Sequence, residues 1–174
     1  MKTLVDHLAQ YAAYHRDQRN ILSHFIGIPL IVLAVAVLLS RPGSEVFGLW
    51  LSPALLVALA AGTFYVRLDR RFGLVMALLL ALSLWAGAGL ALQSTPVWLS
   101  SGIGLFVFGW VIQFVGHYYE GRKPAFVDDV MGLVIGPLFV AAEAAFLLGL
   151  RKDVEQAIVE RAGPTCIRDK HASS

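Results

Sequence analysis

Three histidines stand at the edges of long apolar segments, beside polar side chains that can bind a metal or a substrate. The stretches YHRDQRNILSHFIGIPL (14–30) and QFVGHYYEGRKPA (113–125) supply six such candidates: His15, Asn20, His24, Gln113, His117 and Glu120. Gln113 and His117 lie four residues apart, and His117 and Glu120 three apart. If a helix extends as far as Glu120, these three side chains share one face.

Histidine and carboxylate at this helical spacing are a common way to hold a metal. Two or three imidazoles with one carboxylate leave open positions that suit non-haem Fe(II) and its oxygen chemistry. Zinc accepts the same ligands, so the residue types leave the choice of metal open. A structural interpretation competes with both, because a single histidine at a membrane boundary is usually an interfacial polar residue.

Other polar residues near these motifs also have two interpretations. Arg122 is either an ordinary charge of a cytoplasmic loop or the partner of a substrate carboxylate. Glu143 lies inside an apolar segment, where a carboxylate must be paired, so we expect it to bond a ligand histidine or Arg122. His7 is predicted to be solvated, and His171, in a tail of small polar residues, to be disordered.

The elements that must position these residues are membrane-spanning. Of the 174 residues, 57% are hydrophobic and only 15% are charged, whereas soluble domains carry about 25% charged residues. The stretches 25–40, 46–66 and 72–119 contain no Asp, Glu, Lys or Arg, and a span needs roughly 20 apolar residues. We predict an all-α, polytopic membrane helical bundle with helices at 3–18, 24–40, 47–66, 72–92, 97–117 and 131–150.

The basic residues indicate how these helices cross. Lys and Arg fall almost entirely on one side if the four helices between 24 and 117 cross and 131–150 does not, and divide nearly evenly if it does. We therefore predict four transmembrane helices, a fifth apolar segment that is re-entrant or spanning, and an N-terminal amphipathic helix at 3–18 that lies on the membrane or packs under the bundle. Because four crossings separate His24 from His117, both lie on the same, cytoplasmic side.

Composition also excludes some functions. With a net charge of +2 and no basic cluster, the chain is predicted to have no nucleic-acid partner. The single cysteine, Cys166, excludes an intramolecular disulfide and a cysteine-based metal site. We divide the chain into an integral-membrane domain, 1–150, and a polar C-terminal tail, 151–174, and place it in a bacterial inner membrane.

Three motifs in order, the two above and GPLFVAAE (136–143), resemble those of the Mpo1-like family of bacteria, fungi and plants. The resemblance covers about residues 1–150, although 41–97 match only as hydrophobic spans. It implies Fe(II)-dependent dioxygenation of 2-hydroxy fatty acids, an α-oxidation that yields a fatty acid one carbon shorter. The implied partners are the 2-hydroxy fatty acid, molecular oxygen and the lipid bilayer.

The resemblance places the essential histidines at His15, His24 and His117, which we assign as ligands of Fe(II). We assign catalytic roles to Glu120, Arg122 and Glu143, and substrate binding to Arg122, Asn20 and Gln113, leaving open which of them also reaches the metal. Two alternatives stay open: a zinc-dependent membrane lipid hydrolase, and a transporter or scaffold without enzymatic activity.

Overall fold

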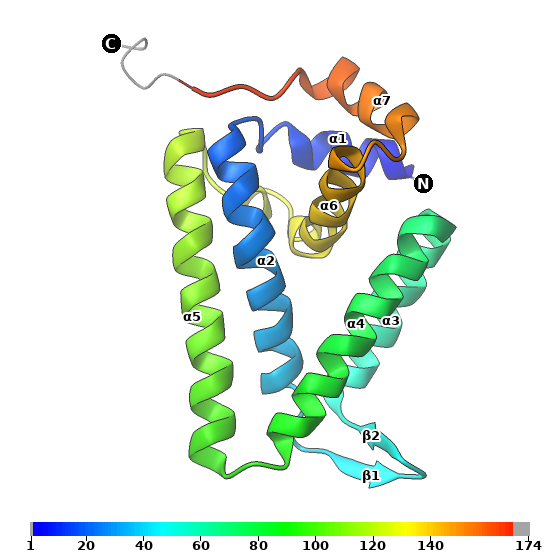
Figure 1. Ribbon diagram of the computed structural model, residues 1–174, viewed down its shortest axis with the longest axis vertical. Helices are drawn as coiled ribbons and strands as arrows, with labels where there is room; N and C mark the ends of the chain where they lie inside the picture. The colour runs from blue at the N-terminus through cyan, green and yellow to red at the C-terminus, as the bar shows by residue number, and fades with distance from the viewer. Residues whose placement is uncertain (1, 169–174) are drawn as a thin grey trace. The chain divides into compact units, whose positions relative to one another are not determined.

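Helices make up most of the part of the chain that the structure describes, residues 2–168 of this computed structural model (Figure 1). In chain order the elements are α1 (Leu4–Ala12), α2 (Gln18–Leu38), β1 (Ser44–Val46), β2 (Leu49–Leu51), α3 (Pro53–Leu68), α4 (Arg70–Ala91), α5 (Thr95–Glu120), the 3-10 helix η1 (Ala125–Val127), α6 (Met131–Leu147) and α7 (Lys152–Ala162). The predicted all-α architecture is confirmed. His171, which was predicted to be disordered, lies outside the described residues.

The chain divides into two compact units, and helices α2 and α5 contribute residues to both. The first unit joins the residues up to 28 with those from 111 onward, and the second comprises 29–110. Every candidate site residue belongs to the first unit, so this unit alone positions the candidate site.

In the first unit, α1 packs against α6 and α7 (Figure 1). The amphipathic pattern of α1 buries Leu4, Leu8 and Tyr11, and α7 contributes the buried side chains of Val154 and Ile158. Each fully buried aliphatic side chain adds about 1.5–3 kcal/mol of stability. Of the two predicted placements for the N-terminal helix, packing against the rest of the fold is therefore the one observed.

The boundary between the predicted helices 3–18 and 24–40 lies elsewhere in the structure: the first helix ends earlier and the second begins earlier than predicted. Helix α1 ends before His15 and α2 starts at the residue after Asp17, so a turn carries His15. Asp17 is the N-cap of α2, because its carboxylate accepts a hydrogen bond of 2.9 Å from the backbone N–H of Arg19. The apolar stripe of α1 continues in register to His15 beyond the end of the helix, which is why the pattern predicted a single helix.

The predicted helix 131–150 ends early, and the polar tail contains a helix, α7, that the sequence did not predict. Gly149 adopts a φ of +75°, and the N–H of Leu150 donates to the carbonyl of Ala145 at 2.8 Å, as in a glycine-terminated helix. The chain then turns, and the axes of α6 and α7 differ by 116°.

In the second unit, α3 and α4 form an antiparallel hairpin whose only connecting residue is Asp69 (Figure 1). The Asp69 side chain caps α4 by accepting a hydrogen bond of 2.9 Å from the N–H of Phe72. A Cβ added at Gly73 would lie 2.5 Å from Cα of Val66. Glycine at this position is therefore what permits the two helices to approach so closely.

The predicted helix 47–66 was wrong at its start, where β1 and β2 form an antiparallel hairpin. The two residues of its loop, Phe47 and Gly48, have φ values of 50° and 76°, which suit a type I′ turn. Helix α3 begins only at Pro53, because proline fits the first helical turn, where its missing N–H costs no hydrogen bond.

Helices α2, α4 and α5 are long and apolar enough to cross a membrane. Helix α3, with 16 residues, rises only about 24 Å against a hydrocarbon core of roughly 30 Å, so it needs a locally thinner bilayer. Helices α6 and α7 are long and apolar enough to cross a membrane only if the two together, as one bent pair, form a single span. These elements correspond to the predicted membrane bundle with a fifth apolar segment.

Candidate metal centre

Three histidines from separate parts of the chain converge in the first unit. His15 lies in the turn between α1 and α2, His24 in α2, and His117 near the end of α5. All three are buried, and their candidate ligand atoms lie within 4.8 Å of one another. The ring centroids are separated by 4.5, 5.0 and 5.2 Å, with the rings steeply inclined to each other. This spacing allows three nitrogens to bind a single ion.

Backbone carbonyls determine which ring nitrogens are available. Nδ1 of His15 lies 2.7 Å from the Tyr11 carbonyl, and Nδ1 of His24 lies 2.8 Å from the Asn20 carbonyl. A carbonyl can only accept, so each Nδ1 donates and each Nε2 keeps its lone pair. Metal-binding histidines are typically oriented in this way.

Within the described histidine cluster, two buried ring nitrogens have no hydrogen-bond partner: Nε2 of His15 and Nδ1 of His117. Leaving a buried polar atom unpaired costs about 1–3 kcal/mol. Burial, followed by the proximity of His24, holds the pKa of His15 well below its ordinary value of 6.5. His15 is therefore neutral, which is the state that binds a metal, and the unpaired nitrogens fit a site for a cation.

Aromatic rings form one wall of the cluster. The ring of Tyr11 stacks on His15 with centroids 4.1 Å apart and an interplanar angle of 6°. Phe139 of α6 lies 5.0 Å from Tyr11 and 5.8 Å from His15. This wall fixes the plane of the His15 imidazole and removes water from one of its faces.

A close contact between α2 and α5 sets the separation of His24 and His117. A Cβ added at Gly116 would lie 1.9 Å from Oγ of Ser23 and 2.6 Å from Oδ1 of Asn20. Only glycine leaves room for these side chains, so the two helices approach closely at Ser23 and Gly116, the residues directly before His24 and His117.

Glu120 is buried and its carboxylate faces the start of α2. It accepts hydrogen bonds from the backbone N–H of Arg16 at 3.0 Å and of Asp17 at 2.8 Å. The side-chain amide of Asn20 donates to it at 3.1 Å. Helix α5 does extend to Glu120, as the shared face required. Among the described residues, however, the converging ligand group consists of the three histidines without a carboxylate.

Glu143 does not bond a histidine or Arg122, and that expectation was wrong. Its carboxylate lies 3.8 Å from the guanidinium of Arg16. The Arg16 side chain is buried and donates from Nε to the carbonyls of Ala12 at 2.8 Å and His15 at 3.0 Å. Glu143 is therefore linked to the turn that carries His15 indirectly: Glu143 pairs with Arg16, and Arg16 donates to the backbone of that turn.

Arg122 lies on the exposed side of the same turn. Its Nη1 donates to the carbonyl of Ala13 at 2.8 Å. The rest of its guanidinium stays available to an anion, because one hydrogen bond uses only one of its five donors.

In the part of the chain that the structure describes, two buried side-chain amide oxygens, Oδ1 of Asn20 and Oε1 of Gln113, have no hydrogen-bond partner. Gln113 lies one helical turn from His117 on α5. Both oxygens can accept a hydrogen bond from the hydroxyl group of a bound molecule.

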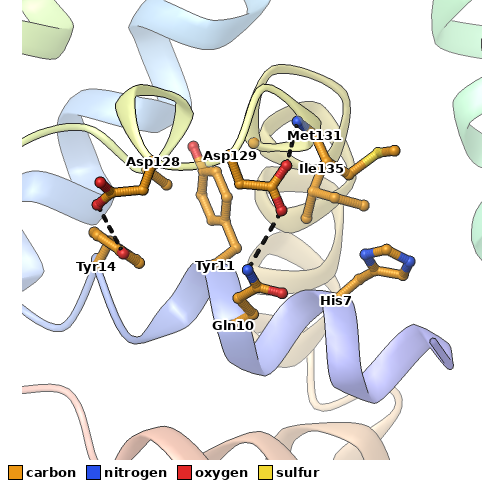
Figure 2. A pocket seen from close by; sticks show the side chains of 10 residues that line it. His7, Gln10, Tyr11, Tyr14, Asp128, Asp129, Met131 and Ile135 are labelled. Carbon is orange, nitrogen blue, oxygen red and sulfur yellow. Dashed lines mark hydrogen bonds between the residues drawn. The ribbon is translucent and has the colours of Figure 1, made fainter.

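A cavity of about 240 Å³ lies between α1 and the segment from η1 to α6 (Figure 2). Its wall is partly polar: the hydroxyl of Tyr14 donates to Asp128 at 2.9 Å, and the amide of Gln10 donates to Asp129 at 3.4 Å. These hydrogen bonds connect α1, through Gln10, and the turn that follows it, through Tyr14, with the loop that precedes α6.

Tyr11 lines this cavity (Figure 2), and its ring also stacks on His15. One ring therefore connects the cavity with the histidine cluster. His7 lies in the cavity wall and is half-buried rather than fully solvated. It does not belong to the cluster.

The sequence did not single out Tyr11, Arg16 or Arg168 as site residues. Tyr11 fell on the same helical stripe as His15, which was the available signal. Arg168, which forms an ion pair of 2.8 Å with Glu120, comes from the tail, where no pattern marked it.

Comparison with known proteins identifies similar sequences. A family model for Mpo1-like proteins, described as 2-hydroxy-palmitic acid dioxygenase Mpo1-like, matches residues 1–148. The 2-hydroxy-palmitic acid dioxygenase MPO1 of Saccharomyces cerevisiae is 35% identical over 148 residues, which are 82% of this chain and 79% of the yeast protein. No solved structure matches the chain.

Proposed function

The chain belongs to the Mpo1-like family, and from this premise we propose that it is an Fe(II)-dependent dioxygenase that converts 2-hydroxy fatty acids into fatty acids one carbon shorter. The yeast relative is named for an activity of this class. The observation that carries the proposal is the convergence of three buried imidazoles, two of which have an unpaired nitrogen. We assign the activity to the membrane domain, 1–150.

His15, His24 and His117 would hold the iron, which would supply the oxygen chemistry when bound. An all-imidazole donor set fits Fe(II), since imidazole is a ligand that suits this metal. The histidines are oriented in advance by the carbonyls that accept from two of them.

The remaining candidates would bind and orient the substrate or support the ligands. Arg122 would pair with the substrate carboxylate, and the unpaired oxygens of Asn20 and Gln113 would accept from its 2-hydroxyl. Glu120 and Glu143 would act indirectly, by holding the turn that carries His15.

The test is anaerobic incubation of the purified protein with Fe(II) and a 2-hydroxy fatty acid, followed by oxygen and detection of the product by mass. We expect a fatty acid one carbon shorter. His24→Ala and His117→Ala should each lose stoichiometric metal and turnover. His7→Ala is the matched control, because His7 lies outside the cluster, and it should keep both.

A zinc-dependent lipid hydrolase is the second candidate, and one observation favours it. The cluster lacks the carboxylate of the common two-histidine iron site, and three histidines also form catalytic zinc sites. Stoichiometric zinc after anaerobic purification, with turnover indifferent to iron and oxygen, would replace the dioxygenase proposal. If neither histidine variant changed metal content or lipid turnover, the transporter or scaffold alternative would stand instead.

We also propose that the site faces the cytoplasm, in a bacterial inner membrane. The distribution of Lys and Arg supports the cytoplasmic side.

A further inference from the structure

Residues 164–168, which follow α7, lie beside the turn that carries His15. The N–H of Cys166 donates to the carbonyl of Arg16 at 2.8 Å, and the N–H of Gln18 donates to the carbonyl of Cys166 at 2.9 Å. These bonds pair Asp17 with Cys166 in a parallel bridge. We call residues 164–168 the strap; it lies outside residues 1–148, the range that the family model matches.

Arg168 is the last residue of the strap and is bound at three points. Its backbone N–H donates to the carboxylate of Asp17 at 2.8 Å, and its carbonyl accepts from Arg19 at 2.8 Å. Its guanidinium forms an ion pair with Glu120 at 2.8 Å. The strap therefore contacts the start of α2 and the end of α5 together.

The pair with Glu120 matters because that carboxylate is fully buried, with 0% of its side chain exposed, whereas the Arg168 side chain is 34% exposed. A buried carboxylate that loses its cation leaves an uncompensated charge, which is strongly destabilising. The guanidinium of Arg16 donates from Nη1 to the carbonyl of Gly163 at 2.9 Å, and its Nη2 lies 3.8 Å from Glu143. Among the described residues, Arg168 is the guanidinium that pairs with Glu120. Glu120 in turn accepts hydrogen bonds from the N–H groups of Arg16 and Asp17, the two residues that follow His15.

We propose that the strap is a positioning element of the histidine site, in which Arg168 acts through Glu120 on the turn that carries His15. Arg168 does not touch the histidines; it fixes the carboxylate that orders their supporting backbone. The kinetic consequence rests on the proposed function, whereas the docking of the strap and the affinity for a metal do not.

The test compares Arg168→Ala, Arg168→Lys and a chain shortened after Gly163 with the full chain. Co(II) titration reports metal affinity, and loss of a residue that supports the ligands typically weakens it by about 10- to 100-fold. We expect a loss of this size in Arg168→Ala and in the shortened chain, with partial rescue in Arg168→Lys because the charge remains. In turnover, kcat should fall while KM for the 2-hydroxy fatty acid stays nearly constant.

The matched control is Arg161→Ala, which removes another ion pair of the C-terminal region, that with Asp6, without touching Glu120. It should keep the metal affinity of the full chain. Cys166 is exposed and is the single cysteine, so a nitroxide attached there reports the mobility of the strap directly. We expect restricted motion in the full chain and in Arg161→Ala, and faster motion in Arg168→Ala.

The outcomes separate this proposal from the proposed function. If the full chain binds Co(II) but converts no 2-hydroxy fatty acid, the proposed function fails. The Co(II) affinities of the variants then still test the role of the strap. If it binds no metal, nitroxide mobility and hydrogen exchange of residues 13–20 judge the strap. If Arg168→Ala does not fold, Arg168→Lys and Arg161→Ala carry the comparison. Wild-type metal affinity and wild-type nitroxide mobility in the Arg168 variants would overturn the proposal.

Discussion

At the scale of single residues, the candidate site depends on which polar atoms are paired and which are not. The carbonyls of Tyr11 and Asn20 occupy one nitrogen each of His15 and His24. Glu120 is saturated by backbone and side-chain donors. Imidazole nitrogens and amide oxygens are among the buried atoms of the described residues that have no hydrogen-bond partner, and these are the kinds of group that a metal and a hydroxylated ligand would use.

Substitution of Tyr11 tests whether the aromatic wall supports His15. Its side chain is 8% exposed, and truncation of a large buried aromatic residue costs about 3–5 kcal/mol. We expect Tyr11→Ala to lower the free energy of unfolding by this amount and to weaken metal binding, because His15 loses its stacking partner. Tyr11→Phe should keep most of both. Chemical denaturation in detergent and Co(II) titration are the measurements.

The control is Tyr118→Ala, since Tyr118 is 69% exposed. Exposed substitutions usually change stability by less than about 0.5 kcal/mol. Equal losses in Tyr11→Ala and Tyr118→Ala would contradict the role of the wall.

At the scale of elements, the histidines are positioned by the start of α2, the end of α5 and the close contact between these two helices. Glu120, at the end of α5, accepts from backbone N–H groups at the start of α2, where the helix dipole favours a negative charge. The two helices therefore hold each other in register through the same residues that border the cluster.

The helix crossing can be tested with glycine substitutions in α5. Gly116→Ala puts a Cβ into Ser23 and Asn20, and overpacking of this kind costs about 1–3 kcal/mol. We expect lower thermal stability and weaker metal binding, because His24 and His117 move apart. Gly104→Ala, in the same helix, meets nothing within 4 Å and should leave both unchanged. Loss of metal binding in both variants would contradict this explanation.

The start of α1 should respond to acid. Hydrogen bonds from the backbone and hydroxyl of Thr3, with a further contribution from Arg161, lower the pKa of Asp6 from 3.8 to about 2. A carboxylate with a lowered pKa stabilises the fold above its unfolded pKa, and this stabilisation is lost as the pH falls through about 2. The protection factors of the α1 amides against hydrogen exchange, which correct for the intrinsic pH dependence of exchange, should therefore fall between about pH 4 and pH 2. In Asp6→Asn, the protection factors should depend less on pH in this range, and an unchanged pH dependence would refute the assignment.

At the scale of the whole molecule, the histidine cluster requires that α2 begins and α5 ends on the same side of the membrane. Cysteines introduced at Gln18→Cys and Lys123→Cys, in a Cys166→Ser background, should react with a membrane-impermeant maleimide from one side. Gln93→Cys, before the opposite end of α5, should react from the other side. Labelling of Gln18→Cys and Lys123→Cys from opposite sides of the membrane would contradict the predicted topology.

The apolar stretches and the charge distribution were enough to predict a helical membrane bundle, because hydrocarbon leaves a chain few other ways to satisfy its backbone. Counting crossings also predicted that His24 and His117 meet on one side. The spacing of Gln113, His117 and Glu120 predicted their shared face on α5.

Only the tertiary structure decided what each polar residue does. Glu120, whose catalytic role stays a prediction, accepts hydrogen bonds from backbone N–H groups of a segment about one hundred residues away in the sequence, and no local pattern encodes such a bond. The early end of α1, the pairing of Glu143 with Arg16, and the strap with Arg168 have the same origin. A helix or a membrane span follows from residues close together in sequence, whereas the partner of a buried charge is set by which distant segments pack against it.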